Sequence, residues 1–112
     1  MTGVQTCALP ISRYLEERAI EAYGAYYKIH WPAEEAHAAR NLRLSPLHER
    51  LAHAGAVFGS KMGWERPNWF ADAAKGDRPH DEYTYGRQNW FAAVGREHRA
   101  CREAAVLIDQ TS

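Results

Sequence analysis

Apolar positions recur with helical spacing in two long parts of the chain. Between residues 14 and 30 they follow steps of three and four residues, which places them on one face of a helix. A second stripe of this kind runs over residues 92–105. Pro32 limits the first stripe, because the residue before a proline avoids the helical region of backbone angles. The pattern predicts two main helices, at about 14–30 and 92–105.

A short helix is predicted between them, at about residues 46–54. Ser45 is a favourable N-cap residue, and Pro46 suits the first helical position. Gly55 suits the position just past the end, where left-handed backbone angles are common. The preceding residues, 32–44, are predicted to form a polar connector.

The glycine-interrupted stretch AVFGSKMGW that follows predicts a short strand and a turn. Gly63 and Pro67 punctuate GWERPNW, so this stretch is predicted to be a fixed turn rather than a strand interior. In such a turn we expect Trp64 in the core and both Glu65 and Arg66 in solvent. The last residues, VLIDQTS, are predicted to enter a buried strand. The whole pattern predicts a truncated α+β fragment with two main helices, one short helix and a few short strands.

Length and charge narrow the class of protein. The chain has 112 residues, enough for one domain at most, and it carries 14 basic and 14 acidic side chains. A general binder of nucleic acid or of a membrane surface normally carries a basic excess. We therefore expect neither nucleic acid nor a membrane as a partner.

The first twelve residues, MTGVQTCALPIS, carry no charge, although charge is dense from Arg13 onward. They lack the basic start and the longer apolar core of a signal peptide. The stretch looks like the translation of a constant DNA-sequencing adapter, so we expect residues 1–12 to be an artefactual or disordered leader. Cys101 is then the single cysteine of the protein, which suits a reducing compartment.

Residue spacing predicts no catalytic constellation. His48 and His53 are five residues apart, which does not place them on one helical face as a zinc pair would need. His98 and Cys101 fall in the apolar stripe of the second main helix, and Cys101 is predicted to be a buried small side chain. The sequence shows no phosphate-binding loop, dinucleotide fingerprint or Ser-His-Asp order. We assign no catalytic residue and no metal ligand to this chain.

The tripeptide Asn-Trp-Phe occurs twice, at residues 68–70 and 89–91, and an arginine stands two residues before each copy. Tryptophan suits ligand walls and domain interfaces as well as cores, because it joins a large apolar ring to a polar N–H. The flanking residues of the two copies differ, so we interpret the match as coincidence rather than a structural repeat. Core packing is the default interpretation, and a ligand wall is the alternative.

From Arg13 onward the chain resembles the dimethylglycine dehydrogenase and sarcosine dehydrogenase family of flavoenzymes. The matching stretches are YLEERAIEAYGAYYKIHWP, SPLHERLAHAGAVFGSKMGWERPNWF and YGRQNWFAAVGREHRACREAAVLIDQTS. The resemblance places residues 13–43 at the end of the family's central domain. It places residues 44–112 in the N-terminal part of an incomplete aminomethyltransferase-like domain, which binds folate in that family.

The resemblance implies a parent enzyme that oxidises a secondary or tertiary N-methyl amine with FAD. The one-carbon unit would then pass to tetrahydrofolate or leave as formaldehyde. In the family, the flavin and amine sites would lie before Arg13 and most folate contacts after Ser112, so the chain alone is expected to be inactive and to bind neither cofactor. The candidate cofactor-binding residues of this chain, near the folate domain, are Trp64, Glu65, Arg66, Asn68, Trp69, Arg87, Asn89 and Trp90.

The resemblance also implies partners and a location. The expected partners are the N-methyl amine, folate and the missing portions of the flavin and folate domains. The expected location is the cytoplasm in a bacterium or the mitochondrial matrix in a eukaryote. The sequence does not separate dimethylglycine, sarcosine and related amines, or dehydrogenase from oxidase.

Two other functions stay open at this point. One is a stand-alone aminomethyltransferase of the glycine-cleavage type, against which the resemblance of the helix at 14–30 to the flavoenzyme's central domain argues. The other is a non-catalytic, aromatic-rich interaction module.

Overall fold

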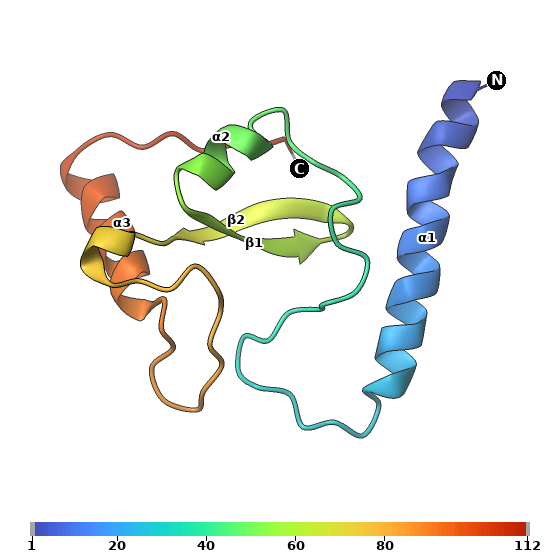
Figure 1. The fold of residues 1–112 in the computed structure, drawn as a ribbon, viewed down its shortest axis with the longest axis horizontal. Helices are drawn as coiled ribbons and strands as arrows, with labels where there is room; N and C mark the ends of the chain where they lie inside the picture. The colour runs from blue at the N-terminus through green and yellow to red at the C-terminus, as the bar shows by residue number, and fades with distance from the viewer. Residues whose placement is uncertain (1, 112) are drawn as a thin grey trace.

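A computed structural model of the chain describes the backbone of residues 2–111 and the side chains of residues 11–111. Helices and a two-stranded antiparallel sheet are both present, which confirms the predicted α+β class. In chain order the elements are α1 (Thr2–Gly24), α2 (His48–His53), β1 (Ala56–Lys61), β2 (Trp64–Phe70), the 3₁₀ turn η1 (Ala73–Lys75) and α3 (Phe91–Glu103) (Figure 1).

Strands β1 and β2 form a hairpin closed by a two-residue turn. Lys61 pairs with Trp64, and the two turn residues, Met62 and Gly63, have φ angles of 52° and 84°. Positive φ at both central positions is typical of the tight turns whose twist matches that of the strands. The prediction that GWERPNW is a turn is therefore wrong, because the chain reverses just before Trp64 and the rest of that stretch is strand β2.

Pro67 is tolerated inside β2 because the ladder is irregular beside it. Val57 pairs with Trp69 and Phe58 pairs with Pro67, so Asn68 is an extra residue on β2. A bulge of this kind interrupts the hydrogen-bond ladder and bends the strand. It also interrupts the alternation of side chains that a sequence pattern relies on.

The core lies where α3 packs against the hairpin. Val57, Trp69 and Ala93 are buried together, with Trp90 and Val94 partly buried against them. In Figure 1, α3 lies at one end of the hairpin and α2 lies along its upper side. The first half of α3 therefore holds the hairpin, while the second half extends past it.

Because the second half of α3 extends past the hairpin, two predictions for the C-terminal part of the chain are wrong. Cys101 was predicted to be buried, but it lies on the exposed second half of α3. Residues 106–108 were predicted to enter a buried strand, but they form no strand and are at least half exposed. Within residues 2–111, no strand lies beside them to form a ladder.

The first helix differs from its predicted bounds at both ends. It ends at Gly24 rather than near residue 30, and residues 25–27 form a turn. Glycine is about 1 kcal/mol less favourable than alanine inside a helix, which suits an end at this position. The backbone of the adapter-like stretch from Thr2 is helical and continuous with the rest of α1. That residues 1–12 are an artefactual or disordered leader stays a prediction.

Helix α2 begins at His48 rather than Pro46, so the prediction that Ser45 is its N-cap is wrong: Leu47 stands at that position and makes no side-chain capping bond. The Ser45 hydroxyl oxygen accepts a hydrogen bond from the backbone N–H of Leu47 (3.1 Å), so Ser45 closes a turn just ahead of the helix. Gly55 follows the last helical turn with a φ of 92°, as expected for a residue that ends a helix.

Replacing Gly55 by alanine is expected to lower the free energy of unfolding by about 2–3 kcal/mol, from left-handed backbone strain and overpacking together. A Cβ there would lie 2.4 Å from the carbonyl oxygen of Ala71, a backbone atom that cannot turn away. Gly76→Ala is the matched control, because φ is 81° there and nothing lies within 4 Å of the added carbon. Urea unfolding of both variants should show the larger loss for Gly55→Ala; equal losses would contradict the packing argument.

Candidate functional site

Residues 31–43, here called the strap, connect α1 to the rest of the molecule and run between them (Figure 1). The segment has almost no regular secondary structure, yet Ala39 within it is only 2% exposed. Its polar groups are bonded to α1 on one side and to the hairpin on the other. The predicted polar connector is thus a structural element in its own right.

Two carboxylates of α1 hold the backbone of the strap. Glu21 accepts hydrogen bonds from the backbone N–H groups of His37 (2.7 Å) and Ala38 (3.2 Å). Glu17 accepts one from the N–H of Ala39 (3.0 Å). The pKa of Glu17 is lowered, chiefly by its hydrogen bond with Arg13. Burial alone would raise the pKa of Glu21, but the strap N–H groups and Arg18 together outweigh it, so the net direction is downward. Both carboxylates are therefore held in their charged form.

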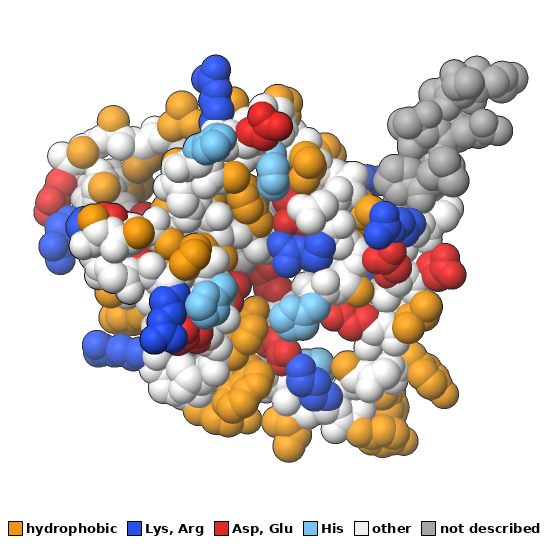
Figure 2. Space-filling model, in the orientation of Figure 1, with side chains coloured by type: hydrophobic (Ala, Val, Ile, Leu, Met, Phe, Trp, Pro, Cys, Tyr) orange, Lys and Arg blue, Asp and Glu red, His pale blue; other side chains and the backbone are white. Residues whose placement is uncertain are grey.

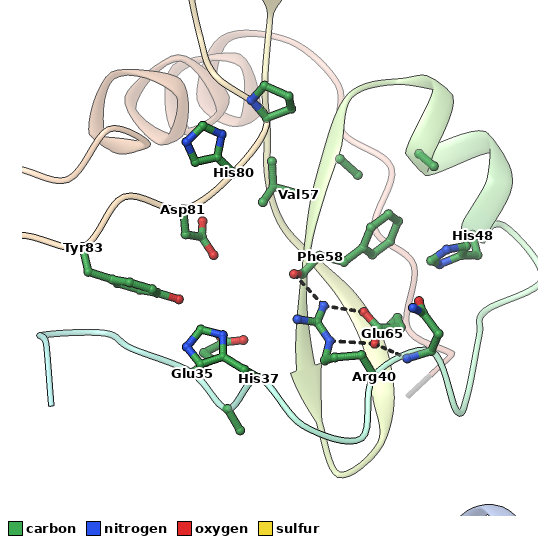
Figure 3. A pocket seen from close by; sticks show the side chains of 15 residues that line it. Glu35, His37, Arg40, His48, Val57, Phe58, Glu65, His80, Asp81 and Tyr83 are labelled. Carbon is green, nitrogen blue, oxygen red and sulfur yellow. Dashed lines mark hydrogen bonds and ion pairs between the residues drawn. The ribbon is translucent and has the colours of Figure 1, made fainter. Parts of the chain in front are cut away.

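On the other side, Arg40 forms a two-pronged ion pair with Glu65 of β2 (Figure 3). The Nε and Nη2 atoms of Arg40 lie 2.8 and 2.6 Å from the two carboxylate oxygens of Glu65. Nη2 also donates to the carbonyl oxygen of Phe58 (2.9 Å), and the N–H of Asn41 donates to Glu65 (2.7 Å). Glu65 is 4% exposed, which corrects the prediction that it lies in solvent.

The electrostatics of this pair follow from its surroundings. Burial alone would raise the pKa of Glu65, but the hydrogen bonds from Arg40 and Asn41 outweigh it and hold that pKa below its usual range. The pKa of Arg40 is raised, chiefly by its hydrogen bond with Glu65. A buried carboxylate needs such a partner, because an unpaired charge in a protein interior is strongly unfavourable.

The backbone on both sides of Arg40 is turned into the left-handed region. Ala39 has a φ of 58° and Asn41 a φ of 59°. Asparagine tolerates such angles, whereas alanine loses about 1–2 kcal/mol there. The hydrogen bonds from the N–H groups of Ala39 and Asn41 offset this strain. The left-handed angles on both sides of Arg40 direct its side chain toward β2.

An open cleft of about 530 Å³ lies beside this ion pair, between the strap, the hairpin, α2 and the loop at residues 79–83 (Figure 3). Figure 2 shows histidine and acidic side chains gathered around this region of the surface. Its labelled lining residues in Figure 3 are Glu35, His37, Arg40, His48, Val57, Phe58, Glu65, His80, Asp81 and Tyr83.

Protein groups already bind the acidic side chains of the cleft. Glu35 accepts hydrogen bonds from the N–H of Ser60 (3.1 Å) and the side chain of Asn68 (3.0 Å). Asp81 accepts one from the indole N–H of Trp69 (2.7 Å). Burial raises the pKa of Tyr83, so that phenol stays protonated. These contacts show that the cleft walls stabilise the fold; the described residues include no cluster of three or more potential metal ligands.

Five of the eight sequence candidates hold neighbouring parts of the chain. Glu65, Asn68 and Trp69 bind Arg40, Glu35 and Asp81 as described above. The side chain of Asn89 accepts from the N–H of Glu82 (3.0 Å) and donates to the carbonyl of His80 (2.7 Å). Trp90 meets Tyr83 edge to face, with ring centroids 5.8 Å apart.

The other three candidates are placed by aromatic or pocket contacts instead. Trp64 is half-buried rather than in the core, and the guanidinium carbon of Arg43 lies 5.8 Å from its ring centroid. Arg66 is half-buried, and it lines a shallow pocket with Trp64. Arg87 is exposed, with its guanidinium carbon 4.6 Å from the ring centroid of Phe91. The structure therefore does not gather the eight side chains into one site.

Arg40 is the residue that sequence reasoning missed. It stands in the polar connector among several charged residues, and no spacing rule distinguishes it from Arg43. A buried acid on a strand requires a basic partner, but the bulge removes the regular alternation that would mark Glu65 as buried. The pairing of Arg40 with Glu65 depends on the folded path of the strap, which the sequence pattern does not indicate.

Acid is expected to weaken the fold partly through Glu65. A carboxyl group whose pKa is lowered in the folded state stabilises it above the unfolded-state pKa, and this contribution is lost as pH falls through the folded value. Wild type should therefore be more stable than Glu65→Gln at neutral pH. The gap should begin to narrow below about pH 4.3, the ordinary glutamate value, and close once the pH has fallen past the lower pKa of the folded state. Urea unfolding of both proteins across this range measures the gap; a gap independent of pH would contradict the assignment.

Comparison with known proteins gives two family matches that meet near the end of the strap. Residues 47–112 match the family described as GCVT N-terminal domain. Residues 12–45 match the family described as FAD dependent oxidoreductase central domain.

Individual relatives span most of this chain. A 4-methylaminobutanoate oxidase (formaldehyde-forming) of Paenarthrobacter nicotinovorans is 48% identical over 86% of the chain and 11% of its own length. The mitochondrial sarcosine dehydrogenase of Homo sapiens is 36% identical over 88% of the chain and 13% of its own length. The mitochondrial pyruvate dehydrogenase phosphatase regulatory subunit of Mus musculus is 35% identical over 94% of the chain and 12% of its own length.

These matches confirm the resemblance predicted from the sequence, since mitochondrial dimethylglycine dehydrogenases are also among the relatives. The chain spans between 11% and 13% of the length of the three relatives described in the preceding paragraph. What these proteins do as wholes therefore bears on this chain only as a basis for proposals.

Proposed function

The chain belongs to the GCVT N-terminal domain family, and from this premise we propose that it is part of an FAD-dependent oxidoreductase acting on N-methyl amines. The observation that carries the proposal is the adjacency of the two family matches, at residues 12–45 and 47–112, in one chain. We place the boundary between the central domain and the aminomethyltransferase-like domain between residues 43 and 44, close to where the two family matches meet.

In the proposed reaction, a hydride leaves the N-methyl carbon of the amine and the amine becomes an iminium ion. Bound FAD is the acceptor that supplies this redox chemistry. Tetrahydrofolate, which loses two N–H hydrogens in the exchange, takes the one-carbon unit as a methylene group and frees the demethylated ammonium ion. Water in place of folate gives the same ammonium ion and formaldehyde. An electron acceptor must then reoxidise the flavin.

We propose that the described residues of this chain do not themselves form a flavin site. An FAD pyrophosphate is commonly held by a glycine-rich turn between a parallel strand and a helix. The sheet described here is an antiparallel hairpin, and its tight turn joins two strands. We therefore propose that the flavin is held by other parts of the whole protein, and that this chain contributes the connection to the folate-side domain.

For folate, we propose two kinds of role among the eight candidates. Glu65, Asn68, Trp69, Asn89 and Trp90 act as scaffold, because each is already bonded to or packed on a neighbouring segment. We propose Trp64, Arg66 and Arg87 for contact with a ligand or another domain, because each is half-buried or exposed and none of the hydrogen bonds described above uses its side chain.

A regulatory function is the second candidate, and one observation favours it. The mouse relative named as a phosphatase regulatory subunit matches this chain at an identity close to that of the sarcosine dehydrogenase. The relatives therefore include both proteins named as oxidoreductases and one named as a regulatory subunit. A stand-alone aminomethyltransferase fits less well, because residues 12–45 match the flavoenzyme family.

The location follows the same reasoning. The printed names of the human and mouse relatives call those proteins mitochondrial. We propose the mitochondrial matrix if the source is a eukaryote and the cytoplasm if it is a bacterium. Among the described residues, no helix is both long and apolar enough to cross a membrane.

Anaerobic flavin reduction in the whole protein tests the proposed function. The purified protein should be mixed with sarcosine, dimethylglycine or 4-methylaminobutanoate, with glycine and 4-aminobutanoate as unmethylated controls. At least one N-methyl compound should bleach the visible flavin band, and its control should not. A protein that binds no flavin, or whose flavin is reduced by dithionite but by none of these amines, would contradict the proposal and favour the regulatory alternative.

A further inference from the structure

The boundary between the two family matches falls at residue 46, and groups of the strap cross it to reach the hairpin. Besides the ring of Tyr14, which lies beside Gly63, hydrogen bonds from the strap join the α1 side to the hairpin. Among the described residues these bonds come from Glu35, Arg40, Asn41 and Arg43.

Arg43 forms a backbone attachment next to the boundary. Its N–H donates to the carbonyl of Gly63 (3.1 Å), and its carbonyl accepts from the N–H of Glu65 (2.9 Å). Both bonds reach the start of β2, at the turn end of the hairpin. Two backbone bonds at one residue hold the strap at a point and leave the preceding residues able to rotate about it.

Arg40 prevents that rotation. It lies three residues before Arg43 and binds β2 through Glu65 and β1 through the carbonyl of Phe58. A planar guanidinium with two parallel bonds to one carboxylate fixes direction as well as distance. Glu35 also reaches the hairpin, through the N–H of Ser60 and the solvent-exposed side chain of Asn68. Both are single bonds to a carboxylate, so they fix direction less than the two parallel bonds of the Arg40–Glu65 pair do.

Ion pairs of this kind are suited to specifying an arrangement. Domains joined by a small polar interface move relative to one another by default. A buried ion pair adds little net stability compared with apolar side chains of similar volume, but in some proteins it selects one arrangement. The strap is joined to the hairpin mainly by polar bonds, and Glu65 is its most deeply buried acceptor.

We propose that the Arg40–Glu65 pair is a positioning element that holds the FAD-oxidoreductase-like segment in one orientation on the GCVT-type hairpin. Because the two segments lead to different cofactor domains in the function proposed above, this orientation sets how efficiently the one-carbon unit passes from amine oxidation to folate. This second step of the inference rests on that proposed function; the first step does not.

The test uses the whole protein with spin labels on α1 and α3. Glu16→Cys provides one labelling site and the native Cys101 the other, since both positions are exposed. Cys7 and any further cysteine are replaced by serine. The variant is the double substitution Arg40→Met with Glu65→Met, which replaces the ion pair by apolar side chains and leaves no buried charge. Arg66→Met on the same strand is the matched control.

Pulsed electron paramagnetic resonance should give one narrow label-to-label distance distribution in wild type and in Arg66→Met. The double variant should give a broadened or shifted distribution while it stays folded, with a melting temperature above that of Arg40→Ala and close to that of wild type. An unchanged narrow distribution in a folded double variant would overturn the positioning role. If the double variant loses its fold instead, the pair is a stability element and the proposal also fails.

A second measurement on the same proteins addresses the transfer step. With saturating N-methyl amine and tetrahydrofolate, the double variant should reduce its flavin at the wild-type rate and release several-fold more formaldehyde per amine oxidised. Equal formaldehyde release would overturn the link between orientation and transfer. Absence of flavin reduction in wild type would instead remove the proposed function, while the distance measurement would still decide the positioning role.

Discussion

Replacing Trp69 by alanine is expected to lower the free energy of unfolding by about 3–5 kcal/mol, the usual range for a large buried aromatic side chain. Trp69 is 2% exposed and packs with Val57 and Ala93 where α3 meets the hairpin. Its indole N–H also donates to Asp81, which fixes the loop that walls the cleft. The substitution removes packing and leaves the Asp81 oxygen without this donor. Urea unfolding of the full chain, or of the longer protein that carries it, followed by circular dichroism, measures the loss.

The second Asn-Trp-Phe copy supplies the control for this prediction. Trp90 occupies the same place in the tripeptide, but it is only partly buried beside the core. Trp90→Ala should therefore cost clearly less than Trp69→Ala, and Trp69→Phe should isolate the part due to the indole N–H. Equal losses at Trp69 and Trp90 would contradict the core described here and restore the view that the copies are equivalent.

Arg40→Ala is expected to lower the free energy of unfolding by about 3 kcal/mol, near the lower end of the range for breaking a buried ion pair. The lower end applies because the Arg40 side chain is 31% exposed, whereas that of Glu65 is 1% exposed. The loss arises mainly from the carboxylate left behind, which keeps only the N–H of Asn41. Thermal and urea unfolding at neutral pH measure it.

The double substitution with methionine at positions 40 and 65 separates this explanation from loss of packing alone. It should restore much of the stability lost in Arg40→Ala, because no unpaired charge remains in the interior. If the double variant is instead as unstable as the sum of its single substitutions, the two side chains do not act as a pair. That result would also remove the basis for a positioning role.

Local signals in the sequence located the elements whose ends are marked by particular residues. Gly55 ends α2 with a positive φ as predicted, and the helix predicted at about 92–105 is present as Phe91–Glu103. Gly63 and Pro67 predict a turn in the stretch where the structure has strand β2. A proline beside a bulge breaks that rule, since the ladder there is already interrupted.

The candidate site was less predictable than the fold, because its contacts join residues far apart in the sequence. Glu65 and Arg40 are 25 positions apart and belong to different family matches. The aromatic composition marks the Asn-Trp-Phe segments as candidates. The strap has the composition of an ordinary polar connector, so the sequence does not mark it in the same way. Periodicity describes which face of an element is apolar, but it does not say which charged side chain reaches it.

The fate of the methyl carbon tests most directly the claim that this chain joins amine oxidation to a folate domain. The whole protein should be given an N-methyl amine substrate labelled with carbon-13 in the methyl group, together with tetrahydrofolate and an electron acceptor, and the products followed by nuclear magnetic resonance. The account predicts that the label enters the methylene bridge of the folate product faster than free labelled formaldehyde condenses with tetrahydrofolate under the same conditions. A label that appears only as formaldehyde, at the same rate with and without folate, would contradict it.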